Sequence, residues 1–279
     1  MSNINHPNII HLYKTFEENN SLYFVYEYFP STDLESYVKD FKKNNPNKYI
    51  NQDIVIKILK QILLGLQYLH NCGIFHRDIK PASILIDTNY NVKITSFDLS
   101  AFYKQGFGIL SSNCTFVGQI NYVCPEILNK QPYDYKCDIF TLGYTMHFVM
   151  NFILPTKTDV SKGMEKISRI QINTINNNYN PQLIQLIKKM YNDNPSERPD
   201  ATQCLQELEL MQKNIAPINP MNSVNNLNQI HNDSNQNINN GDKIEDLFPY
   251  IHEPKKVIKF SNINTASNGN YINDKFLPL

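Results

Sequence analysis

A run of apolar residues at helical spacing between residues 51 and 73 constrains the fold of this chain more than any other feature. The apolar positions recur every three or four residues, which is the period of one helix face: Ile54, Ile58, Ile62, Leu66 and Leu69. Asn51 can cap the start of this helix, and Gly73 can adopt the left-handed conformation that often follows a helix end. The pattern predicts a long helix with one buried face, against which other segments must pack.

Shorter apolar runs on both sides of this helix have the composition of β-strands. Residues 22–28 (LYFVYEY) combine aromatic and β-branched side chains, and residues 9–16 are expected to pair with them through a turn at 18–20. Residues 83–87 and 91–95 predict a second small hairpin, and residues 34–41 predict a short helix. The first third of the chain therefore mixes strands with helices.

The later part of the folded chain has a helical pattern. The apolar run 140–154 is interrupted by His147 and Asn151, so we expect a buried core helix there and no membrane span. Pro181 suits the first turn of a helix, and Asp200 with Gln203 has the spacing of a capping box. The sequence predicts an α+β fold whose larger part is mostly α-helical.

The composition changes near Lys213, after which asparagine dominates and few side chains could form a core. Such a segment cannot offset the entropy lost on ordering, so residues 213–279 are expected to be a disordered tail. Within it, residues 244–260 (IEDLFPYIHEPKKVIKF) are richer in apolar side chains. They are either a docking motif or a local cluster without a function.

Charge and cysteine content exclude some classes of function. The chain has 26 basic and 26 acidic residues and no formal net charge, so a polybasic surface for nucleic acid or membranes is not expected. Its five cysteines are scattered without a C-x-x-C pair, which indicates neither a zinc site nor a disulfide framework. With no signal peptide after Met1, we expect a reducing compartment, the cytoplasm or alternatively the nucleus.

The segment after the long helix, His76-Arg77-Asp78-Ile79-Lys80-Pro81, resembles the catalytic loop of the eukaryotic protein kinases. Other matches occur in the family's order: N-H-P-N-I-I at 5–10, Y-E-Y at 26–28, K-I-T-S-F-D-L-S at 93–100, C-P-E at 124–126, Asp138 with Gly143, and E-R-P at 197–199. The resemblance covers residues 5–210. It implies a kinase-like large lobe at 31–212, preceded at 1–30 by a two-strand remnant of the small lobe, and Lys80 indicates the Ser/Thr type.

The resemblance implies a role for each matching residue. Asp78 would be the general base, Lys80 would steady the transferred phosphoryl group, and the hinge at Glu27 and Tyr28 would hold adenine. Arg77 would pair with a phosphorylated residue of the segment that follows. The candidates for that residue are Ser111, Ser112 and Thr115. The residues expected to hold the lobe together are His76, Phe97, Glu126, Asp138 and Arg198.

Two magnesium ligands of the family are replaced by serine in this chain. The catalytic-loop asparagine falls at Ser83, and the aspartate of the D-F-G motif falls at Ser96. Mg²⁺ prefers carboxylate or carbonyl oxygens, so a neutral hydroxyl is a weak substitute. Asp98 is a possible replacement, but a shift of two residues along a strand moves its carboxylate by about 6–7 Å. We interpret Ser96 as a true loss.

The nucleotide site departs from the family in other ways. A Gly-rich loop and the Lys–Glu pair of the small lobe are not expected upstream of Asn5, and G-F-G at 106–108 is interpreted as a flexible loop. Gln119 stands where the family usually has threonine. Tyr26 either narrows the nucleotide pocket or is simply a core aromatic.

Three functions are compatible with this pattern. The first is a catalytically impaired, pseudokinase-like module that binds, scaffolds or regulates a protein partner. The second is an active Ser/Thr kinase that uses ATP and Mg²⁺ on a protein substrate, with its small lobe supplied by another chain or encoded upstream of Met1. The third is a decayed fragment without a folded role. Nucleic acid and membranes are not expected as partners in any of the three.

Overall fold

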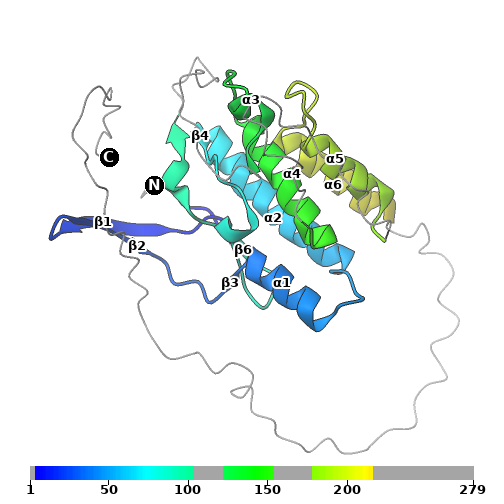
Figure 1. The fold of residues 1–279 in the computed structure, drawn as a ribbon, viewed down its shortest axis with the longest axis horizontal. Coiled ribbons are helices and arrows are strands. Elements are labelled where there is room, and N and C mark those ends of the chain that lie inside the picture. The colour runs from blue at the N-terminus through cyan, green and yellow to red at the C-terminus, as the bar shows by residue number, and fades with distance from the viewer. Residues whose placement is uncertain (1–3, 103–121, 154–177, 216–279) are drawn as a thin grey trace, which may run out of the picture.

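The computed structural model describes residues 4–102, 122–153 and 178–215 of the 279-residue chain. Figure 1 shows a hairpin of two strands beside a body of stacked helices, with short strands between them. Helix α2 (Gln52–Asn71) runs through the middle of the body, where it contacts α4 (Lys136–Asn151) and α6 (Ala201–Ile215). This arrangement matches the predicted α+β fold with a larger helical part.

The N-terminal hairpin consists of β1 (Leu12–Glu18) and the antiparallel strand β2 (Ser21–Tyr26). Its turn residues Asn19 and Asn20 have φ values of 49° and 59°, the left-handed conformation that two-residue hairpin loops favour. The pairing was predicted correctly, but β1 begins later than residue 9. Ile9 instead forms a parallel bridge with Ile94, because Ile9 is buried against the helical body.

The long helix α2 has the predicted ends. The Asn51 side chain accepts a hydrogen bond from the Asp53 backbone N–H at 2.7 Å, and Gly73 has a φ of 72°. Before α2, helix α1 (Leu34–Asn44) is capped by Asp33, which lies in the short strand β3 (Thr32–Asp33). The predicted second hairpin is present as β5 (Ile84–Ile86) and β6 (Val92–Ile94), and β3 pairs with its outer edge.

Two further short strands precede and follow this hairpin in the sequence. Strand β4 (Ile74–Phe75) follows α2 and pairs with β7 (Ala101–Phe102). Short 3-10 helices at Pro81–Ser83 and Phe97–Leu99 connect these strands to β5 and β6. The segment between β4 and β5 is therefore a loop anchored at both ends by β-pairing.

The C-terminal helices form the rest of the core. Helix α3 (Pro125–Leu128) is short, α4 is buried along almost its whole length, and α5 (Pro181–Met190) begins at the predicted proline. The capping box before α6 is present, since Asp200 and Gln203 exchange hydrogen bonds of 2.8 and 2.9 Å. Gly143 lets α4 approach α5 closely, because a Cβ atom there would lie 3.1 Å from the Met190 Cβ.

Several predictions fall on residues that the structure does not describe. They include the candidate phosphorylation sites Ser111, Ser112 and Thr115, Gln119, the G-F-G at 106–108 and the docking motif at 244–260. Helix α6 extends to Ile215, three residues past the predicted boundary at 212. Among the described residues, no helix combines the length and the apolar character that crossing a membrane requires.

One prediction about the cysteines was wrong. The structure joins Cys124 and Cys137 in a disulfide, with their Cα atoms 5.5 Å apart. The sequence did not indicate this bond, because the two residues are separated by 13 positions and meet only when α3 packs against the first turn of α4. Of the other described cysteines, the exposed Cys72 and the buried Cys204 are free thiols.

Candidate functional site

One carboxylate of the core helix α4 binds the backbone of the loop between β4 and β5. Asp138 accepts hydrogen bonds from the backbone N–H groups of His76 and Arg77 at 2.9 and 2.7 Å. It also contacts the His70 ring Nε2 at 2.9 Å. Burial alone would raise the pKa of the Asp138 carboxyl, but the hydrogen bond and charge of His70 hold that pKa below its ordinary value. Asp138 is therefore ionised and fixes the shape of the loop.

His76 lies inside the loop as a neutral, fully buried side chain. Its Nε2 lies 2.9 Å from the Thr95 carbonyl, and its Nδ1 accepts from the Asp78 backbone N–H at 3.3 Å. The ring meets the Phe97 ring edge-on, with centroids 4.8 Å apart. Burial lowers the pKa of the imidazole. These partners make His76 a packing residue that joins the loop to the segment after β6.

Asp78 and Lys80 form a close ion pair at the surface of this loop. The Lys80 Nζ lies 2.6 Å from the Asp78 Oδ2, and the side chains are 19% and 10% exposed. The structure thus brings together the two residues that sequence analysis assigned to catalysis. Chemically, the pair offers a carboxylate that could accept a proton and an ammonium group that could bind a phosphoryl oxygen.

The two serines at the metal-ligand positions lie on either side of the Thr95 backbone. The Thr95 N–H donates to the Ser83 carbonyl at 2.9 Å, and Ser96 follows with the left-handed φ of 65°. The Ser83 hydroxyl is fully buried and has no hydrogen-bond partner in the described part of the chain. Such a shielded hydroxyl cannot offer an accessible lone pair to a cation.

Asp98 is the possible substitute for these serines. It is exposed in the 3-10 helix after Ser96, and its charge acts on Tyr26: burial, with a smaller contribution from Asp98, raises the pKa of the Tyr26 hydroxyl. Mg²⁺ requires several oxygen ligands in near-octahedral geometry. The residues at the two ligand positions, a buried hydroxyl and a second neutral hydroxyl, do not fit a magnesium site.

The predicted hinge is occupied by an internal ion pair. The Glu27 carboxylate contacts the Lys93 Nζ at 2.8 Å and accepts from the His11 backbone N–H at 2.8 Å. Burial would raise the pKa of Glu27, but the Lys93 ammonium and the His11 N–H lower it overall. Tyr28 is 82% exposed. A hollow of about 260 Å³ beside Glu27 has a mostly polar lining, unlike the apolar walls that a planar base would favour.

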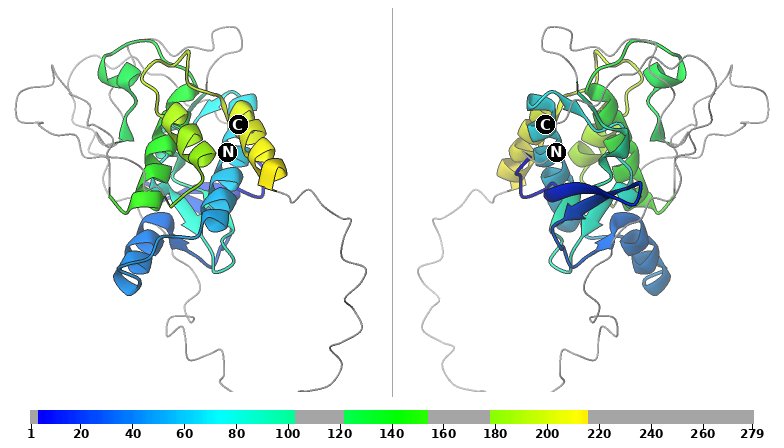
Figure 2. Two further views of the ribbon diagram at one scale, coloured as in Figure 1. Left: turned by 90° about the vertical axis from the view of Figure 1, so that its right-hand side faces the viewer. Right: turned by 90° about the vertical axis from the view of Figure 1, so that its left-hand side faces the viewer.

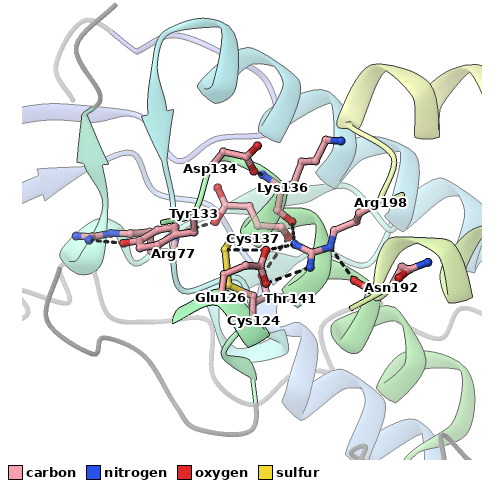
Figure 3. Close-up of a disulfide and its surroundings, with 11 residues drawn as sticks. Arg77, Cys124, Glu126, Tyr133, Asp134, Lys136, Cys137, Thr141, Asn192 and Arg198 are labelled. Carbon is pink, nitrogen blue, oxygen red and sulfur yellow. Dashed lines mark hydrogen bonds and ion pairs between the residues drawn. A yellow bond between two sulfur atoms is a disulfide. The ribbon is translucent and has the colours of Figure 1, made fainter. Parts of the chain in front are cut away.

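A buried ion pair joins α3 to the segment before α6 (Figure 3). The Arg198 guanidinium contacts both oxygens of Glu126, at 2.9 and 3.2 Å, and the two side chains are 0% and 5% exposed. Arg198 also donates to the backbone carbonyls of Asn192 and Lys136, at 3.1 and 2.9 Å, and lies over the Phe140 ring. Each of the three guanidinium nitrogens of this buried cation therefore donates at least one hydrogen bond.

Arg77 points away from the loop toward Leu99, in the motif at 93–100, and toward Tyr133, which sequence analysis did not single out. Its side chain donates to the Leu99 carbonyl and, at 3.3 Å, to the Tyr133 hydroxyl. Sequence analysis missed Tyr133 as the partner of Arg77. It also missed the contact of His70 with Asp138 and the ion pair of Lys93 with Glu27. The motif spacing carries no signal for such partners, since they meet the motifs only through packing of distant elements.

The comparison with known proteins identifies the family. Residues 1–208 match the family described as "Protein kinase domain". The chain therefore belongs to the protein kinase family.

The curated relatives include CBL-interacting protein kinase 26 of Oryza sativa subsp. japonica, which is 31% identical over 70% of this chain and 38% of its own length. Serine/threonine-protein kinase Nek3 of Mus musculus is 32% identical over 74% of this chain and 39% of its own length. The chain thus spans well under half of each of these two relatives. Relatives of this kind support the Ser/Thr branch of the family.

Proposed function

We propose that this chain is a catalytically impaired kinase-family module that binds or scaffolds a protein partner. The observation that carries the proposal is the full burial of Ser83, a neutral residue at the position of a magnesium ligand. Ser96 supplies a second neutral group at the other ligand position. Charge neutralisation by a metal ion is worth several kcal/mol in phosphoryl transfer, and each ~1.4 kcal/mol is tenfold in rate. Loss of that contribution would reduce turnover on the order of a thousandfold.

Two sets of contacts that hold the lobe are present in the same molecule. Asp138 is bonded to the loop backbone, and Glu126 is bonded to Arg198. Selection for a folded surface requires these contacts but does not require metal ligands. This division between intact scaffold and degraded ligand set supports a binding role.

The hairpin β1–β2 is the surface that we assign to the partner. Figure 2 shows it lying across one side of the helical body. Its large apolar side chains are exposed: Tyr13, Phe16, Leu22, Phe24 and Val25. A hairpin of two strands is at best marginally stable in water. A protein that pairs with its edge and covers these side chains would stabilise it.

The test of impaired catalysis is a Mg²⁺·ATP binding titration combined with a protein kinase assay on the full chain. The proposal expects neither Mg²⁺-dependent nucleotide binding nor phosphoryl transfer, and it expects Asp78→Asn to behave as the wild type does. Tight Mg²⁺-dependent binding with turnover that Asp78→Asn abolishes would contradict it.

The partner surface has its own test. Hydrogen exchange of residues 9–28 should be fast in the isolated chain and slow when a partner is bound. Strong protection in the isolated monomer would remove the reason for assigning a partner to this surface.

An active Ser/Thr protein kinase is the second candidate. The ion pair between Asp78 and Lys80, at 2.6 Å, favours it, because both residues retain the chemistry that the family uses. This candidate would require ATP, Mg²⁺ and a protein substrate. The comparison of wild type with Asp78→Asn decides between the two candidates directly.

A further inference from the structure

The disulfide between Cys124 and Cys137 closes a loop at the N-terminal end of α4 (Figure 3). Cys124 precedes Pro125, the first residue of α3, and Cys137 lies in the first turn of α4. Both residues are buried, with exposed fractions of 0% and 3%. Their Cα separation of 5.5 Å is near the commonest value for disulfides. No shift of either helix is needed to form the bond.

The closed loop contains two residues that contact distant parts of the lobe. Glu126, near one end, forms the buried ion pair with Arg198. Tyr133, toward the other end, accepts the hydrogen bond from Arg77. The residue after Cys137 is Asp138, which holds the loop between β4 and β5. The state of the two sulfur atoms is therefore linked to contacts on both sides of the loop.

The Cys137 sulfur also lies 3.8 Å from the Glu126 Oε1. A thiol at this position can donate a weak hydrogen bond to the carboxylate, whereas a disulfide sulfur has no proton to donate. Reduction would thus exchange a covalent link for a hydrogen bond that supports the Glu126–Arg198 pair. Each oxidation state has its own set of contacts, so the fold can accommodate both.

We propose that Cys124 and Cys137 are a reversible thiol–disulfide modification site, which in its oxidised form fixes residues 124–137 against α4. This proposal does not depend on whether the chain is active. The oxidant is a small-molecule disulfide such as glutathione disulfide. Because both sulfur atoms are buried, the exchange requires local opening of residues 124–137. One cysteine thiolate then attacks the small disulfide and releases one thiol, the second cysteine attacks the mixed disulfide, and a second thiol leaves. The two cysteines lose two electrons and two protons in total, and the small disulfide gains both.

Two observations favour a reversible bond over other uses of these cysteines. Cys72 is an exposed, free thiol in the same chain, as expected where thiols persist and disulfides exchange. The alternative is a metal site, since Cys124, Glu126 and Cys137 lie within reach of one ion. However, Arg198 binds both Glu126 oxygens, and two thiolates alone fall short of the four ligands that zinc requires.

The experiment equilibrates the full chain with glutathione and glutathione disulfide at a series of ratios. Free thiols are then blocked by alkylation, and peptides are mapped by mass spectrometry under non-reducing conditions. A peptide that links residues 124 and 137 is expected to increase with the proportion of glutathione disulfide and to disappear after treatment with dithiothreitol. The oxidised chain should have an unfolding equilibrium constant lower by on the order of a hundredfold, as a loop of this size predicts.

Variants assign the effect to this pair. Cys124→Ala and Cys137→Ala should each remove the dependence of stability on the glutathione ratio, whereas the matched control Cys72→Ser should retain it. If either core variant fails to fold, peptide mapping of the wild type and of Cys72→Ser decides the question.

Three results would overturn the proposal. The first is the lack of a 124–137 link in the folded chain at every ratio. The second is an unchanged redox dependence in Cys124→Ala. The third is binding of Zn²⁺ to the reduced chain that protects both thiols from alkylation, since that would make the pair a metal site.

Discussion

Replacing Glu126 with glutamine tests how much the buried ion pair contributes to the fold. Glu126→Gln keeps the shape of the side chain but leaves the Arg198 guanidinium buried beside a neutral amide. Removing one partner of a buried ion pair costs ~3–5 kcal/mol, because the remaining charge stays desolvated. Arg198 keeps two backbone carbonyl partners and the Phe140 ring. We therefore expect the lower part of this range, about 3 kcal/mol.

Urea unfolding followed by circular dichroism measures this loss. With a slope of about 2 kcal/mol per molar urea, a loss of this size moves the midpoint by roughly 1.5 M. The matched control is Glu207→Gln, which removes the partner of Lys189 at a pair whose side chains are 43% and 35% exposed. Partly exposed pairs contribute about 0–1 kcal/mol. All variants are compared in dithiothreitol, so that the Cys124–Cys137 bond is absent throughout.

A second variant separates the charge from the packing. Glu126→Gln combined with Arg198→Met removes the orphaned cation, so the double variant should be more stable than the sum of the two single losses predicts. The reasoning is refuted if Glu126→Gln costs no more than Glu207→Gln. It is also refuted if the losses of the two single variants simply add.

Three further predictions concern single side chains. Asp138→Asn should cost about 2–3 kcal/mol at pH 7, measured by urea unfolding, because the loop backbone loses charge-assisted hydrogen bonds. Since the pKa of Asp138 is lowered in the folded chain, the difference from wild type should persist down to the ordinary carboxyl pKa and should be lost as the pH falls below it and through the lowered pKa of the folded chain. Burial lowers the pKa of His147 to about 4, so the unfolded chain binds a proton that the folded chain excludes between pH 6.5 and 4, and stability should fall by about 3 kcal/mol across that range. His147→Phe should remove this contribution to the pH dependence, and an unchanged slope would contradict it. Ser83→Ala should leave the free energy of unfolding within about 1 kcal/mol of the wild-type value or raise it, because the hydroxyl has no partner among the described residues. A larger loss of stability would mean that the hydroxyl forms a hydrogen bond.

Local sequence patterns predicted α2, the start of α5 and the capping box of α6. By contrast, α1 runs three residues further than expected, α4 covers 136–151 where the apolar run covers 140–154, and α3 was not predicted. Asn51, Gly73 and the pair Asp200 and Gln203 act within a few residues of their own position, so their effects are visible in the sequence. The start of the first strand was missed because Ile9 follows the tertiary contact with Ile94 and not its own hairpin. Strand ends depend on such distant partners more than helix ends do.

The candidate site shows the same division. The motif order located the loop and the residues replaced by serine. It did not reveal that the Ser83 hydroxyl is buried, that Arg77 donates a hydrogen bond to Tyr133, or that Cys124 and Cys137 form a disulfide. Each of these depends on contacts between segments that are distant along the chain, which motif spacing does not encode.

The hydrogen bonds of Asp138 have a consequence for interpreting degenerate relatives of this chain. Because a core carboxylate holds the backbone of His76 and Arg77, the loop keeps its conformation for as long as the helical body folds. Both hydrogen bonds come from backbone N–H groups, so they do not require particular side chains in the loop. The conformation of this loop is therefore evidence for the architecture of the lobe, and it is a poor guide to whether the chain turns over a substrate.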